Sequence, residues 1–300
     1  MFRSCCSRRK LACCSSRRVG QYSAILLAAS LAFGRPALGQ LAQPNERGVA
    51  MGHLHYFVDD VAANRDFWLA LGGSRVASPE GEIVKMPGVL IFISEADAGS
   101  NSSVLDHVAF RVRSLETIEA RGFDLELLEA FPGIASIHTP NGDRIELFEE
   151  GTATNVGFDA DAADQSDGVA GRHNRPLVAA LDSHHLHFYL PEAQVAAARD
   201  WYVEHFGAVA GMRWRYLAAD LPGMNLNFSA TDPERAPTRG QTLDHIGFEI
   251  ENLEQFCRAL EAAGLELEQP FRRSGASLAT AVLVDPWGTT IELSEGLALY

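Results

Sequence analysis

Histidine and glutamate residues recur at matching places in the two halves of this sequence. The candidate metal ligands are His53, His107 and Glu146 in the first half and His185, His245 and Glu292 in the second. Two imidazoles and one carboxylate form a facial set that suits Fe(II), Mn(II), Ni(II), Co(II) or Zn(II) and leaves coordination positions open. A lone histidine in a strand is more often structural, but the same residue types in the same order in both halves favour a metal site.

The segments around these residues repeat as well. HLHYFVDD from His53 returns as HLHFYLPE from His185, DHVAF from Asp106 as DHIGF from Asp244, and NGDRIEL from Asn141 as WGTTIEL from Trp287. The order is the same in both halves and the spacings are similar. This pattern indicates a duplicated domain.

Alternation along the strands predicts the direction of the side chains. Leu54 and Tyr56 alternate with His53 and His55, and His107 and Glu146 lie in similar patterns. The apolar face must pack on helices, so the histidines and the glutamate lie on the opposite face, inside the cup of a curled sheet. We expect one site within each copy; a site built across the copies is the alternative.

The elements that position these residues alternate between strands and helices. The first copy predicts helices over 61–71, closed by Gly72, and over 115–121, stopped by Gly122. In the second copy Asn252 and Gln255 predict a capping box, and Gly264 predicts a left-handed C-terminus. The copies span 49–150 and 183–300, and 151–182 lacks apolar periodicity and reads as a linker.

The N-terminus predicts export. Residues 1–39 show a basic region, a short apolar run and small residues before Gln40, which is the order of a signal peptide. Two arginine pairs, at 8–9 and 17–18, suit a twin-arginine signal, so we expect a periplasmic or secreted protein. Only Cys257 lies outside this segment, so the mature chain has no intrachain disulfide; helical spacing predicts a core position for it.

The charge balance excludes two classes of partner. The formal net charge is −14, and every charged residue among the first 39 is basic, so the mature chain is still more acidic. An acidic surface repels nucleic acid and anionic lipid. We therefore expect a small-molecule substrate, no nucleic acid, and no membrane contact after signal cleavage.

Taken together, these motifs resemble the vicinal oxygen chelate superfamily, which includes glyoxalase I, extradiol dioxygenases and metal-free bleomycin-binding proteins. The resemblance covers both copies. It implies an α+β fold of two tandem domains, each with two βαβββ motifs in a curved, cup-like mixed sheet. It also implies a divalent metal on the six residues named above, and it allows the two domains to pair with each other or the chain to form a homodimer.

Departures from the family patterns narrow the reaction. Glyoxalase I-like enzymes place a fourth ligand, Glu or Gln, on a strand that here reads VLIFI from Val89, whereas the second copy offers Asn225 and Asn227. Extradiol enzymes carry a tyrosine where Val282 stands. The resemblance therefore favours a lyase or isomerase over a dioxygenase.

The leading interpretation is an exported, metal-dependent, glyoxalase-like lyase or isomerase acting on a small vicinally oxygenated substrate. The alternatives are an Fe(II)-dependent extradiol-type dioxygenase and a non-catalytic binding protein. Candidate catalytic residues are Glu292, Glu146 and His187, and candidate substrate contacts are Asn225, Asn227 and His55. We expect the second copy to carry most of the activity, because Leu90 and Phe92 replace the two asparagines in the first.

Overall fold

The computed structural model describes residues 41–300 apart from 80, 98, 153–156, 163–175 and 275–277. The predicted signal peptide, residues 1–39, lies outside the described residues. No helix within the described part of the chain is long and apolar enough to cross a membrane.

Short strands dominate both halves. In the first half the elements are β1 (Val49–Val58), α1 (Val61–Leu71), β2 (Ser74–Val76), β3 (Glu82–Met86), β4 (Val89–Glu95), β5 (Leu105–Val112), α2 (Leu115–Glu119), β6 (Glu126–Leu127), β7 (Ile134–His138), β8 (Arg144–Glu149) and β9 (Phe158–Ala160). In the second half they are β10 (Leu181–Leu190), η1 (Glu192–Gln194), α5 (Val195–Phe206), β11 (Val209–Arg213), β12 (Tyr216–Leu221), β13 (Met224–Ala230), β14 (Leu243–Ile250), α6 (Leu253–Ala262), β15 (Gln269–Ser274), β16 (Leu278–Val284), β17 (Thr290–Glu295) and η2 (Leu297–Leu299).

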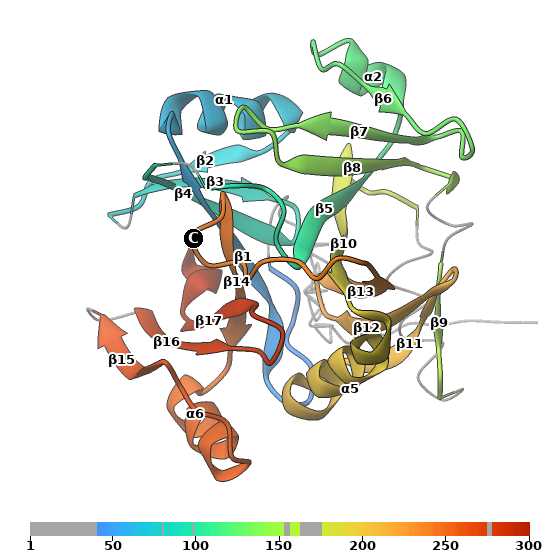
Figure 1. Ribbon diagram of the computed structural model, residues 1–300. Helices are drawn as coiled ribbons and strands as arrows, with labels where there is room; N and C mark the ends of the chain where they lie inside the picture. Colours follow the sequence, from blue (N-terminus) through green and yellow to red (C-terminus); the bar gives the residue numbers. More distant parts are fainter. Residues whose placement is uncertain (1–40, 80, 98, 153–156, 163–175, 275–277) are drawn as a thin grey trace, which may run out of the picture. The chain divides into compact units, whose positions relative to one another are not determined.

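The strands form two mixed sheets, and each sheet takes one βαβββ motif from each half (Figure 1). Sheet I has the order β15-β16-β17-β14-β1-β4-β3-β2, and sheet II has the order β6-β7-β8-β5-β10-β13-β12-β11-β9. The α+β class and the βαβββ motifs are as predicted. The expectation that each copy forms a cup of its own is wrong, because β1 pairs with β14 and β5 with β10 rather than β1 with β5.

The two junctions between the halves have the same register. The antiparallel pairing of β1 with β14 sets His55 opposite His245, and that of β10 with β5 sets His187 opposite His107. On its other side each of these central strands runs parallel to a strand of its own half, β1 to β4 and β10 to β13. The repeated HLH and DH motifs therefore face each other twice, always across the two halves.

Capping groups explain where the helices begin and end. Helix α1 spans the predicted residues, with the Asp60 side chain accepting from the Ala63 N–H and Gly72 ending the helix at φ 131°. Helix α6 differs from the prediction at its start, because Asn252 is left-handed and its side chain makes no capping bond. The carboxylate of Glu295 accepts from the Leu253 N–H instead, at 2.8 Å.

Apolar side chains from both halves share one core. Trp68 and Phe110 belong to the same buried cluster as Phe206 and Phe248. Cys257 is also buried in it, as predicted. The predicted linker is not wholly irregular, because β9 within it pairs with β11 at the edge of sheet II.

Candidate metal centres

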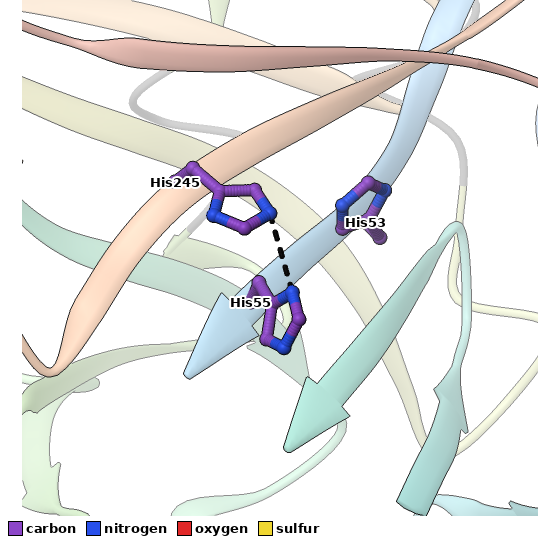
Figure 2. Close-up of side chains that lie close together, drawn as sticks. All are labelled: His53, His55 and His245. Atoms are coloured by element: carbon purple, nitrogen blue, oxygen red, sulfur yellow. Dashed lines mark hydrogen bonds between the residues drawn. The ribbon is translucent and has the colours of Figure 1, made fainter. Parts of the chain in front are cut away.

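The first cluster, site I, lies on sheet I and consists of His53, His55, His245 and Glu292. His53 and His55 come from β1, and His245 comes from the neighbouring β14, as Figure 2 shows. Ligand-type atoms of the three histidines all lie within 4.8 Å of one another. His245 Nε2 is 3.2 Å from His55 Nδ1 and 3.7 Å from Glu292 Oε2, so it sits between an imidazole and a carboxylate.

Burial keeps two imidazoles of site I, those of His53 and His55, uncharged. Desolvation, together with the neighbouring His245, lowers the pKa of His53 well below its ordinary value and that of His55 to about 3. Burial raises the pKa of the Glu292 carboxyl, and the nearby His245 acts in the opposite direction. Neutral imidazoles present lone pairs, which is the form that a metal ion requires.

A glycine makes room for the His53 ring. Gly247 lies opposite His53 in the register of β1 and β14, and a Cβ atom built there would come within 2.0 Å of the imidazole. His53 is 2% exposed, so its ring has little freedom to move aside. The DHIGF motif therefore supplies both a candidate ligand, His245, and the space for another, His53.

The second cluster, site II, lies on sheet II and consists of His107, Glu146, His185 and His187. His107 comes from β5, Glu146 from β8, and His185 and His187 from β10. Glu146 Oε2 is 3.3 Å from His107 Nε2 and 3.7 Å from His185 Nε2. Two imidazole nitrogens thus converge on one carboxylate oxygen.

The histidines of β10 are held in place from behind. His187 Nε2 is 2.7 Å from Ser229 Oγ, and His185 Nδ1 is 2.8 Å from His184 Nδ1. The buried Arg213 in turn donates to His184 Nε2 at 2.7 Å. Burial, followed by neighbouring imidazoles, lowers the pKa values of His185 and His187 well below the ordinary value.

The two asparagines predicted to contact the substrate have different surroundings in the structure. Asn227 lines a cavity of about 280 Å³ above site II, and its buried Oδ1 has no hydrogen-bond partner among the described residues. Asn225 does not line this cavity, because its amide accepts from Arg213 Nε at 3.1 Å and donates to Asp220 at 3.0 Å. The structure therefore contradicts Asn225 as a substrate contact and places it behind Arg213.

The structure brings together all six predicted ligands, but in a different grouping from the one expected. His53 joins His245 and Glu292, whereas His185 joins His107 and Glu146. The grouping within each copy is wrong because strand exchange places the first strand of one half beside the fifth strand of the other. His55 and His187 lie within these clusters as well.

Two aspartates that orient histidines of the sites were not predicted from the sequence. Asp106 Oδ1 is 2.6 Å from His107 Nδ1, and Asp244 Oδ1 is 2.8 Å from His245 Nδ1. A carboxylate on one ring nitrogen fixes the tautomer that leaves the other nitrogen free to bind a metal. The repeated Asp-His dipeptide was the signal that could have revealed them.

The donor set of both sites fits a divalent transition metal. Each site has two or more imidazoles and a carboxylate, and each contains a buried ring nitrogen with no hydrogen-bond partner among the described residues, His53 Nδ1 or His185 Nε2. A buried nitrogen without a partner costs free energy that a bound cation would recover. The residues that would hold the ion are His53, His245 and Glu292 in site I, and His107, His185 and Glu146 in site II.

Comparisons with known proteins agree with this geometry. Residues 182–293 match the family model described as Glyoxalase/Bleomycin resistance protein/Dioxygenase superfamily. Glyoxalase I from Zea mays has the same fold, with a TM-score of 0.58 at 14% identity over 84% of this chain and 94% of that chain. A candidate dioxygenase from Bacillus subtilis gives a TM-score of 0.57 at 13% identity over 86% of each chain. A search of curated proteins finds no match.

The family match lies in the second half, and the first half has the same βαβββ motifs. Residues 182–293 match the model of the glyoxalase, bleomycin resistance and dioxygenase superfamily, and the chain as a whole has the fold of glyoxalase I with two tandem domains. The structural likeness, at this level of identity, concerns the fold and not the reaction.

Proposed function

We propose that the chain is an exported, metal-dependent lyase or isomerase of the glyoxalase type, and that site II is its main catalytic centre. The observation that carries this proposal is the convergence of His107 Nε2 and His185 Nε2 on Glu146 Oε2 beside a cavity of about 280 Å³. The substrate is a small molecule with two neighbouring oxygens. His107, His185 and Glu146 would hold a divalent cation, which when bound would supply Lewis-acid stabilisation of negative charge on the substrate.

The protein groups at site II divide the remaining work. His187 lines the cavity as a neutral imidazole, and its contact with Ser229 Oγ fixes the ring, so it is suited to move a proton. Asn227 Oδ1 is available to accept a hydrogen bond from a substrate hydroxyl. Glu146 lies between the His107 and His185 imidazoles and would hold the cation together with them.

The expected difference in activity between the two sites now depends on which strands line each site. The strand positions beside β1 in site I are Leu90 and Phe92, whereas those beside β10 in site II are Asn225 and Asn227, of which Asn227 lines the cavity. A binding site needs a few well-placed polar groups to orient a substrate. The asparagines lie on β13 of the second half, whereas the carboxylate of the same site is Glu146 on β8 of the first half.

Turnover assays on two matched variants test the proposal. The metal-loaded protein would be screened against α-ketoaldehyde–thiol adducts, catechols and epoxides, and any activity repeated with Glu146→Gln and Glu292→Gln. We expect Glu146→Gln to reduce kcat/KM at least about 100-fold and Glu292→Gln to leave most activity. The reverse result would place the reaction in site I, and ring cleavage of a catechol would favour the dioxygenase alternative.

Export is part of the proposal and has a separate test. We expect the mature chain to begin near Gln40, because a basic, apolar and small-residue order precedes it. Mass spectrometry of the protein from its native host measures the N-terminus directly. Recovery of the intact Met1 form alone would rule out cleavage.

A further inference from the structure

Aromatic rings form one continuous wall from the mouth of the site II cavity to the candidate ligands. Phe131 and Trp214 are in edge contact at 5.1 Å between ring centroids, and Trp214 contacts Tyr216 at 5.7 Å. Tyr216 then contacts His187 at 4.8 Å. Phe131 is 37% exposed and Trp214 45% exposed, whereas His187 is 4% exposed, so the wall leads from solvent to the buried end of the cavity.

The turn that carries Trp214 has an unusual conformation. Trp214 and Arg215 connect β11 to β12, where Arg213 pairs directly with Tyr216. Trp214 has φ 53°, in the left-handed region that favours glycine. A bulky indole in this conformation is disfavoured by local sterics, and its place at the cavity mouth gives the side chain a use.

Positive charge gathers at this mouth although the chain as a whole is acidic. Three arginines line the cavity, Arg144, Arg213 and Arg215, against the single acid Glu146. Arg144 is paired with Asp106 at 2.8 Å, and Arg213 is buried beneath the site with His184 and Asn225. Arg215 differs from both, because no carboxylate among the described residues lies within ion-pair distance of it.

The guanidinium of Arg215 is nevertheless held in a defined orientation. It stacks over the Trp214 ring at 4.2 Å from the centroid, and its Nη2 donates to Tyr216 Oη at 3.2 Å. A stacked guanidinium keeps its remaining N–H groups directed outward in a planar fork, which matches the geometry of a carboxylate.

We infer that site II takes a small carboxylate joined to a flat, apolar body such as an aromatic ring, with Arg215 binding the carboxylate and the Phe131–Trp214–Tyr216 wall contacting the ring. This inference rests on the proposed function in one respect, because it names the substrate class of the same site. The cavity is near the lower end of the size range of small-molecule sites, which suits a single ring. The alternative is that Arg215 covers Trp214 at the surface and binds no ligand.

Binding measurements on metal-free protein test the inference without any turnover. The mature chain, stripped of metal with a chelator, would be titrated by calorimetry with benzoate and with benzamide, which has the same ring but no charge. We expect benzoate to bind about 10-fold or more tightly than benzamide, because a charge-assisted bond to Arg215 is lost with the amide. Arg215→Gln should remove this preference, and Trp214→Ala should weaken both ligands.

A matched variant controls for the general loss of a positive charge. Arg258→Gln replaces an exposed arginine on α6, which connects two strands of sheet I. This variant should leave the benzoate preference unchanged. Arg215→Lys should retain only part of the preference, because lysine keeps the charge without the planar fork. Thermal unfolding checks that each variant is folded.

The outcomes separate this inference from the proposed function. Equal binding of benzoate and benzamide, no binding of either, or an unchanged preference in Arg215→Gln would overturn the inference. A catalytic screen that finds no activity leaves the binding result standing, since benzoate binding requires neither metal nor turnover. A preference for benzoate that survives in the variant but disappears at high salt would also count against Arg215, because it would reflect unspecific charge.

Discussion

At the scale of single residues, the two sites differ at the position facing the first histidine of each set. Gly247 faces His53 in site I, whereas Ala109 faces His185 in site II. A methyl group is thus tolerated beside one imidazole and excluded beside the other. Gly247 therefore leaves the space that the ring of the candidate ligand His53 occupies.

We predict that Gly247→Ala displaces the His53 ring and lowers the metal affinity of site I by about 10-fold or more, because an added Cβ would overlap the imidazole. Metal analysis after dialysis against a weak chelator measures the remaining ions per chain. The reciprocal variant Ala109→Gly should leave site II occupied, since it only removes a methyl group. Full occupancy of both sites in Gly247→Ala would show that His53 is not a ligand.

Asp143 gives a pH dependence with a defined sign. Burial raises its pKa to about 6, against the bonds from the Thr139 hydroxyl and its own backbone. The folded state therefore holds a proton that the unfolded state releases between about pH 4 and pH 6, and the free energy of unfolding falls as the pH rises through this window. We predict that Asp143→Asn raises the free energy of unfolding by about 2 kcal/mol at pH 7.5 and changes it little at pH 4.

Urea unfolding of metal-free protein at the two pH values measures this change. The exposed Asp97→Asn is the matched control and should not alter the pH profile. An equal effect of Asp143→Asn at both pH values would mean that the lost charge is not the cause. Asparagine keeps an oxygen for the Thr139 hydroxyl, so a large loss of stability is not expected.

At the scale of elements, strand pairing decides which ligands meet. The parallel neighbours β14 and β17 set His245 and Glu292 on one face of sheet I, and β5 and β8 do the same for His107 and Glu146 in sheet II. The third candidate ligand of each set comes from the other half, on β1 or β10. Each βαβββ motif therefore carries only part of a site.

A double variant distinguishes this arrangement from sites formed within each copy. We predict that His185→Ala combined with Glu146→Gln removes one ion per chain and leaves the other, because both residues belong to site II. The control pair, His53→Ala with Glu146→Gln, should remove both ions, since it damages both sites. If the ligands were grouped within each copy, the results of the two pairs would be exchanged. Metal stoichiometry by mass spectrometry of the native protein provides the measurement.

At the scale of the whole molecule, the halves are not independent folding units. The described residues of 41–300 fall within one compact unit, and both sheets cross from one half to the other. A half on its own would expose β1 and β5, or β10 and β14, as unpaired edges of its two sheets. Exposed edge strands pair with other chains or aggregate.

We predict that residues 41–150 and 176–300, produced separately, self-associate and lack the metal sites of the intact chain, and that producing them together restores two sites. Size-exclusion chromatography and metal analysis of each half and of the mixture provide the measurement, with the uninterrupted chain 41–300 as the control. A monomeric 176–300 fragment with a full metal site would contradict the exchange of strands, because it contains neither Glu146 nor His107.

The sequence by itself determined the residue types, their faces and the kind of fold. Strand alternation placed His53, His107 and Glu146 opposite the apolar side, and the repeat predicted four βαβββ motifs, because both signals depend on neighbours close in the chain. Only the tertiary structure decided which motifs share a sheet, since the registers His55–His245 and His187–His107 join residues that are remote in sequence. For the same reason Asn225 and Asn227 could not be told apart by strand parity. They share a face, but the packing of Arg213 and Asp220 against Asn225 leaves Asn227 alone facing the cavity.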